Sequence, residues 1–184
     1  MFFPPSPRFI SLEQASALSA QADSRAQRVG VFVTPDDGLL AATLAAVPLD
    51  AIQLHGKEPP ARVAEVKARF GLPVWKALSI SEPADLENAR DYFEVADRLL
   101  FDAKPPKGSV LPGGNAVSFD WTLLSGTEWP LPWLLSGGLH AGNVAEAVRL
   151  TGASAVDASS GVESAPGQKD PARIRAFLDA VAAI

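Results

Sequence analysis

The sequence predicts an α/β fold, a (β/α)8 TIM barrel that lacks its first strand–helix unit, in a single domain covering residues 1–184. The first observation is that short apolar strands alternate with helical runs along the chain. The second is that these strands are continuously apolar, which is typical of parallel strands buried on both faces. Alternation alone fits either an open doubly wound sheet or a barrel. No G-x-G-x-x-G follows the first complete strand, which weighs against a dinucleotide-binding sheet.

The third observation is that two predicted strands within 133–163 each end in small residues. One strand leads into Ser136, Gly137 and Gly138, and the next leads into 157–161, which contains Ser159, Ser160 and Gly161. Glycine lets the backbone approach a ligand closely, and successive free N–H groups can bind an anion. A single Gly-Gly pair could mark only a tight turn. Two such turns at neighbouring strand ends favour a barrel with its phosphate site after strands seven and eight.

Each element has its own local signal. Ser11 and Gln14 form a capping-box pattern, Asp36 and Asp37 can cap the next helix, and Gly71 can end the third. Asp170 precedes Pro171 at the start of a last helix, whose apolar face is predicted to hold Ile174, Phe177, Leu178 and Val181. The predicted strands are 29–33, 51–55, 74–78, 98–102, 133–136 and 154–157, and the predicted helices are 11–21, 36–46, 59–70, one from 81, one from 120, 143–150 and one from 170.

The count of units is one short of a complete barrel. Residues 1–3 are apolar and are cut off by Pro4 and Pro5, so we interpret them as the end of a strand. Six full strand–helix units follow, which leaves one unit, about 30 residues, missing. The stretch 104–119 contains several prolines and glycines and is long for a loop, so it is a candidate lid.

Composition excludes several classes of function. The net charge of −5 and a pI near 5.0 argue against a nucleic-acid or membrane-surface partner. The chain has no cysteine and two histidines, which excludes disulfides and thiolate sites and makes a metal site improbable. No apolar run is long enough to cross a membrane, and the N-terminus does not read as a signal peptide. We therefore expect a cytoplasmic protein without a metal site. Composition does not decide between a monomer and a homodimer, and both stay open.

The sequence resembles the phosphoribosylanthranilate isomerases, barrel enzymes of tryptophan biosynthesis. The matching segments are F-F-P-P-S-P-R-F-I-S, R-V-G-V-F-V, I-Q-L-H-G, F-D-A, P-G-G-N-A-V-S-F-D-W, L-S-G-G-L and V-D-A-S-S-G-V-E followed by P-G-Q-K-D. The resemblance runs from Phe2 to the C-terminus. It implies an Amadori rearrangement of a phosphosugar, from aminoaldose to aminoketose, which needs a general acid, a general base and no cofactor.

The resemblance also implies roles for single residues. The aspartate of F-D-W, Asp120, corresponds to the family's general acid, although the same residue is a natural helix cap. Arg8 lies where the family places an arginine near the anthranilate carboxylate. His55 and Asp157 end strands and are candidate substrate-binding residues, while a core histidine and a turn cap are the plainer alternatives. Phosphate is expected at the backbone of Gly137, Gly138, Ser159, Ser160 and Gly161.

Two departures from the family pattern lead to further expectations. The lid motif reads Gly113-Gly114-Asn115-Ala116, where Ala116 replaces a glycine. The family's general base is a cysteine in K-I-C-G at the end of the first strand, and this chain contains neither. We therefore expect a chain that begins at an internal start, is inactive as written and self-associates through two open barrel edges. The alternatives are a non-catalytic phosphate-binding remnant and another phosphosugar barrel, such as the histidine-pathway isomerase.

Overall fold

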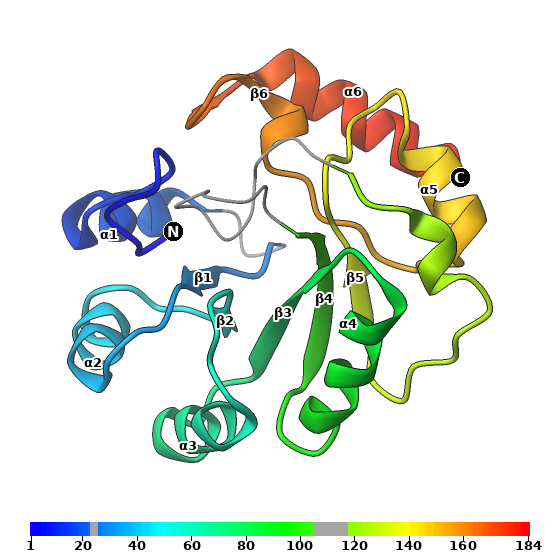
Figure 1. Cartoon of the computed structure of the whole chain (residues 1–184). Coiled ribbons are helices and arrows are strands. Elements are labelled where there is room, and N and C mark those ends of the chain that lie inside the picture. Colours follow the sequence, from blue (N-terminus) through cyan, green and yellow to red (C-terminus); the bar gives the residue numbers. More distant parts are fainter. Residues whose placement is uncertain (23–25, 105–117) are drawn as a thin grey trace.

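The computed structural model describes residues 1–22, 26–104 and 118–184. These residues form an α/β fold in which a curved parallel sheet lies at the centre and helices lie outside it (Figure 1). The predicted lid falls almost entirely on 105–117, outside the described residues, and so does Ala116.

The sheet contains five parallel strands in chain order. They are β1 (Val29–Phe32), β2 (Ala51–Leu54), β3 (Val74–Ile80), β4 (Arg98–Ala103) and β5 (Trp133–Leu135). Each strand pairs with the next in chain order. Because the strands are parallel, their carboxyl ends all lie at the same edge of the sheet, which is called the rim below.

Two further segments extend the sheet at its edges with single contacts. The backbone N–H of Phe2 donates to the carbonyl of Val31 at 2.8 Å, and Leu135 forms an isolated parallel bridge with Val156. The strands predicted at 1–3 and 154–157 therefore occupy strand positions without becoming regular strands.

The helices begin and end close to the predicted residues. In α1 (Leu12–Gln21), Ser11 Oγ accepts a hydrogen bond from Gln14 N while Gln14 Oε1 accepts one from Ser11 N, which confirms the capping box. Gly71, at φ 68°, ends the third helix as predicted. The other helices are α2 (Asp37–Ala46), α3 (Pro60–Phe70), α4 (Pro83–Glu87), α5 (Val144–Thr151) and α6 (Pro171–Ala182).

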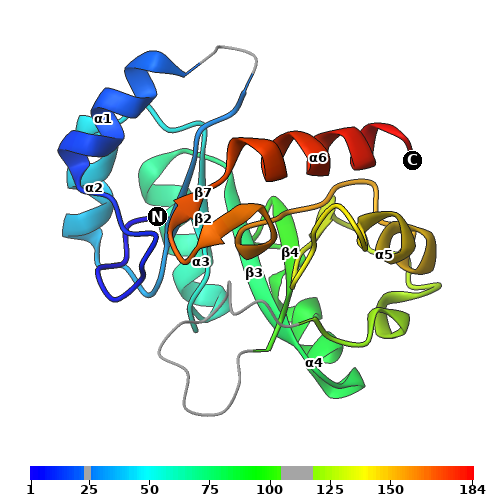
Figure 2. The same cartoon turned by 90° about the horizontal axis from the view of Figure 1, so that it is seen from above.

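Several elements differ from the prediction. The helix expected from 81 is one turn of α-helix, α4, continued by the 3-10 helix η1 (Asn88–Tyr92), and the helix expected at 120 is only the 3-10 helix η2 (Trp121–Leu124). A short antiparallel hairpin of β6 (Glu163–Ala165) and β7 (Gln168–Lys169) follows the 3-10 helix η3 (Ser160–Val162) and was not predicted. It lies between the N-terminal segment and α6 (Figure 2).

The predicted apolar face of α6 was wrong at one position. Phe177 is buried at 8% exposure, whereas Leu178 is 59% exposed. Residues 174, 177 and 181 share one side of a helix with a 3.6-residue period, and 178 lies at the margin of that side. The apolar stripe by which α6 packs against the core is therefore narrower than the sequence suggested.

The main core lies between the outer face of the sheet and the helices. Its centre consists of fully buried side chains, among them Phe32, Leu54, Leu99 and Phe101. A separate, smaller apolar cluster of Ala77, Leu100 and Leu134 lies on the inner face of the sheet. None of the described helices is long and apolar enough to cross a membrane.

Candidate active site

Alternation along the strands decides which side chains face the inside of the curved sheet. Leu100 and Leu134 belong to the inner apolar cluster, with Ala155 packed against it. Two residues further along the same segments stand Asp102, Ser136 and Asp157. Because successive side chains point to opposite faces of a strand, residues two apart share a face. The polar layer therefore lies directly above the apolar layer, at the carboxyl rim.

A cavity of about 170 Å³ opens at this rim. The segments that line it come from the N-terminal region, from the ends of four strands and from the two small-residue turns. Its lining residues are Met1, Arg8, Val31, Gln53, His55, Asp102, Ser136, Gly137, Gly138, Leu139, Asp157, Ala158, Ser159 and Ser160. The structure thus brings together seven of the nine site residues predicted from the sequence, all except Asp120 and Gly161.

His55 is held from both sides of its ring. Gln53 Nε2 lies 3.0 Å from His55 Nδ1, and His55 Nε2 lies 3.1 Å from Asp102 Oδ2. With the Gln53 amide nitrogen donating, Nδ1 accepts and the ring proton is on Nε2, which donates to Asp102. The second oxygen of Asp102 accepts the backbone N–H of Ala103 at 2.8 Å. The imidazole therefore has a fixed orientation beside the pocket.

Asp157 is the second carboxylate of the pocket. Ser136 Oγ donates to Asp157 Oδ2 at 3.0 Å. Burial raises the pKa of Asp157 above its usual value and the nearby charge of Asp102 raises it further, while the Ser136 hydrogen bond opposes the rise. A carboxyl group with a raised pKa is better suited than an ordinary one to exchange a proton with a substrate.

The two small-residue turns approach each other closely. Gly137 and Gly138 adopt φ of 91° and 68°, the left-handed region that favours glycine, and a Cβ on Gly137 would lie 2.8 Å from Ala103 N. A Cβ on Gly161 would lie 1.9 Å from the carbonyl oxygen of Leu139. Gly161 therefore permits contact between the turns and does not itself line the cavity.

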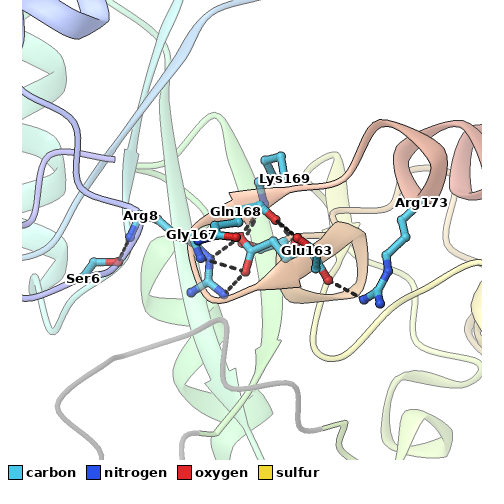
Figure 3. Close-up of polar contacts among 9 residues, drawn as sticks. Ser6, Arg8, Glu163, Gly167, Gln168, Lys169 and Arg173 are labelled. Atoms are coloured by element: carbon cyan, nitrogen blue, oxygen red, sulfur yellow. Dashed lines mark hydrogen bonds and ion pairs between the residues drawn. The ribbon is translucent and has the colours of Figure 1, made fainter.

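Arg8 reaches the cavity from the segment before α1 and is bound to Glu163 at the start of β6 (Figure 3). Its Nε and Nη2 donate to the two carboxylate oxygens at 2.8 and 2.7 Å. This two-point contact fixes the plane of the guanidinium group.

Asp120 occupies a different position. It caps η2, with its Oδ1 accepting from Thr122 N at 3.0 Å and from Thr122 Oγ1 at 2.6 Å. These hydrogen bonds lower the pKa of Asp120. The structure therefore shows Asp120 as the cap of η2, a position that is compatible with an additional role as general acid, and Asp120 is not among the residues that line the cavity.

Sequence reasoning missed Asp102, Gln53, Glu163 and Lys169. Asp102 and Gln53 could have been found from the alternation of side chains along a strand. Each follows an inward-facing apolar residue by two positions near the end of its strand, so each faces inward as well. Glu163 and Lys169 belong to a hairpin that no apolar periodicity in the sequence predicts. Within the described part of the chain, no group of three or more His, Asp or Glu side chains is arranged to hold a metal ion.

Comparison with known proteins agrees with this geometry. Residues 1–180 match the family model of N-(5'-phosphoribosyl)anthranilate (PRA) isomerase. The N-(5'-phosphoribosyl)anthranilate isomerase of Paramagnetospirillum magneticum is 59% identical over 98% of this chain and 84% of its own length. That of Paracoccus denitrificans is 61% identical over 97% of this chain and 83% of its own length.

Two solved structures of phosphoribosyl anthranilate isomerases are also similar to this chain. The crystal structure of phosphoribosyl anthranilate isomerase from Thermotoga maritima has a TM-score of 0.87 at 35% identity, covering 100% of this chain and 86% of its own. A phosphoribosyl anthranilate isomerase in complex with reduced 1-(o-carboxyphenylamino)-1-deoxyribulose 5-phosphate has a TM-score of 0.82 at 34% identity, covering 100% and 85%.

These matches take in nearly the whole chain. They also take in 83–86% of the relatives' own length, and they show neither a missing first unit nor the inactivity inferred from it. The family model and these relatives carry the name N-(5'-phosphoribosyl)anthranilate isomerase and not that of the histidine-pathway isomerase, which was the alternative. The match to the family model and the sequence identity to these relatives show that the chain, with its parallel α/β sheet and rim pocket, belongs to the N-(5'-phosphoribosyl)anthranilate isomerase family.

Proposed function

We propose that this chain converts N-(5'-phosphoribosyl)anthranilate to the corresponding aminoketose in tryptophan biosynthesis. The observation that carries the proposal is one cavity that contains two facing small-residue turns, an arginine and two carboxylates. The substrate has a phosphate at one end, an aromatic carboxylate at the other and a sugar between them. The cavity offers a matching group for each part.

The phosphate is assigned to the turns after β5 and after Val156. Gly137, Gly138, Ser159 and Ser160 line the cavity there and offer backbone N–H groups and hydroxyls. Gly161 contributes by letting the two turns touch. The anthranilate carboxylate is assigned to Arg8, whose planar guanidinium suits a carboxylate.

The reaction needs two proton transfers. An acid donates a proton to the ring oxygen while the bond from that oxygen to the anomeric carbon breaks, which leaves a protonated Schiff base. A base then takes the proton from the adjacent carbon, and the freed electron pair forms the double bond of an enolamine that becomes the ketone. One carbon is reduced and its neighbour oxidised, so no external oxidant or cofactor is consumed.

Asp157 is our proposed base, and Asp120 remains our proposed acid on the family resemblance. The position of Asp157 in the cavity and its raised pKa support its role. The hydrogen bonds from Thr122 hold Asp120 ionised, so substrate has to replace them before this carboxyl can donate a proton. His55, oriented by Asp102, is placed to bind a sugar hydroxyl.

Turnover of the isolated chain tests the function and the assignment together. We expect isomerisation, followed by the anthranilate fluorescence, with Asp157→Asn and Asp120→Asn each losing a factor of about 10² to 10⁴ in kcat and keeping KM within a few-fold. Asp50→Asn, which alters the Arg28 ion pair at the other end of the sheet, is the matched control and should retain turnover.

Each outcome decides between candidate roles. A folded wild-type chain that binds phosphate without turnover would favour the non-catalytic alternative. Near-normal turnover of Asp120→Asn would leave that residue only as the cap of η2. Light scattering of the same samples would decide between the monomer and the homodimer that we expect.

A further inference from the structure

A cluster of charged side chains lies beside the cavity, and of its members the roles proposed above use only Arg8 (Figure 3). At its centre is Glu163, whose side chain is only 3% exposed. Arg8 donates to both of its oxygens, and Lys169 Nζ donates to Oε1 at 2.8 Å. One buried carboxylate therefore binds two cations, one from the N-terminal segment and one from β7.

The backbone around Glu163 is built to keep this arrangement. Gly167, in the hairpin turn, donates its N–H to Glu163 Oε2 at 3.3 Å. A Cβ on Gly167, which has φ 81°, would lie 2.2 Å from the carbonyl oxygen of Pro7. The hairpin turn thus packs directly against the segment that carries Arg8, and the Glu163 carbonyl accepts a hydrogen bond from Arg173 Nη1 in α6.

The same cluster extends to the proposed phosphate site. Lys169 Nζ donates to the carbonyl oxygen of Ser159 at 2.9 Å and lies 3.4 Å from Ser159 Oγ. Ser159 and Arg8 both line the cavity. Glu163 therefore contacts Arg8, which is assigned to the carboxylate end of the substrate. Through Lys169 it is also connected to Ser159, which is assigned to the phosphate end.

The charges of Arg8, Lys169 and Glu163 do not cancel. Two cations beside one carboxylate leave a net positive charge next to a cavity assigned to an anionic substrate. Without the carboxylate, the two cations would lose their shared acceptor and would repel each other, and Arg8 would lose the contact that fixes its plane. We propose that Glu163 is a positioning residue that holds Arg8 and Lys169 in the orientations that bind the two anionic ends of the substrate.

This inference rests on the proposed function, and substrate affinity is its main test. In Glu163→Gln we expect KM to rise about tenfold or more while kcat falls less than about threefold, because both anionic ends are bound equally in the ground state and the transition state. Glu163→Asp, which keeps the charge, should recover part of the affinity. Asp50→Asn is the control that breaks an ion pair remote from the cavity.

An experiment that combines variants distinguishes a positioning role of Glu163 from a purely stabilising one. If Glu163 acts through Arg8 and Lys169, then Glu163→Gln should add less than about twofold to KM in a chain that already carries both Arg8→Gln and Lys169→Met. A full, multiplying effect of Glu163→Gln in that double variant, or an unchanged KM in folded Glu163→Gln, would overturn the proposal.

A surface variant covers the case in which Glu163→Gln fails to fold. The side chain of Lys169 is 46% exposed, so Lys169→Met should fold. It should weaken competitive inhibition by inorganic phosphate several-fold, and unchanged inhibition would contradict the assignment of Lys169.

Binding measured without turnover keeps the two proposals distinguishable. Calorimetry with reduced 1-(o-carboxyphenylamino)-1-deoxyribulose 5-phosphate should give a Kd that rises about tenfold in Glu163→Gln. A wild-type chain that binds this compound without isomerising substrate would sink the proposed function, while the ratio of Kd values would still decide the role of Glu163. A wild-type chain that does not bind it would count against both.

Discussion

The pKa of Glu163 lies far below the ordinary range of a glutamate, so this side chain stays ionised. Burial alone would raise its pKa, but hydrogen bonds from Arg8 and Lys169 outweigh burial and lower the pKa from 4.5 to about 2. The carboxylate that contacts the two cations is therefore ionised at neutral pH. This residue links the architecture of the site to the acid stability of the fold.

Glu163 should make the protein lose stability in acid. Because its folded pKa lies below its unfolded pKa, its contribution is complete above about 4.5 and is lost as the pH falls toward 2. The loss is about 3 kcal/mol. Urea unfolding at several pH values should show wild type and Glu163→Gln converging in this window, and a constant difference between them would contradict the pKa.

At this scale the sequence predicted half of the residues that line the cavity. Glycines and serines after strands signal an anion site, and His55 and Asp157 were visible as polar groups at strand ends. Asp120 shows the limit, because one residue type serves a cap and a proton donor equally well and only the fold decides where it lies. Glu163 was out of reach, since its partner Arg8 lies 155 residues away in the chain.

Among the elements, capping signals were the most informative. Ser11, Asp36 and Asp170 cap helices as their sequence patterns indicate, because a cap depends on atoms within three residues. The hairpin of β6 and β7 was missed because its strands are short and exposed apart from Glu163, so no apolar pattern marks them. Its stability comes from contacts with distant segments.

Helix α6 offers a matched pair of neighbouring side chains. Phe177 is buried in the core at 8% exposure, and Leu178 beside it is 59% exposed. We expect Phe177→Ala to lower the free energy of unfolding by about 3 kcal/mol and Leu178→Ala to change it by less than about 0.5 kcal/mol. Chemical denaturation measures both. Equal losses would place the original four-residue face of α6 against the core after all.

In the whole molecule, the sequence predicted the alternation of strands and helices and the parallel order of the sheet. It could not show how the segments at 1–3 and 154–157 meet the sheet, because each is joined to its neighbour by isolated contacts. Local propensity is the same for a regular strand and for a segment that makes one bridge. The difference depends on the surrounding packing.

Anion binding should be measurable as stability of the whole chain. A ligand that binds only the folded state adds about 2.7 kcal/mol at a concentration of 100 times its Kd, so inorganic phosphate should raise the Tm. Gly138→Leu should abolish this rise. Gly152→Leu is the control, since Gly152 has nearly the same φ, 70° against 68°, at the end of α5. A phosphate effect that survives Gly138→Leu would place the anion elsewhere.

The layering inside the sheet also bears on how such an enzyme can change. Leu100 and Asp102, and likewise Leu134 and Ser136, are separated by one outward-facing residue. Substitution at the rim position alters the chemistry offered to a ligand and leaves the apolar floor beneath it intact. Insertion of one residue before the rim would instead exchange the two faces of the strand and remove both at once. Descendants of this chain are therefore expected to acquire new substrates by point substitution at the rim, while strand lengths stay fixed.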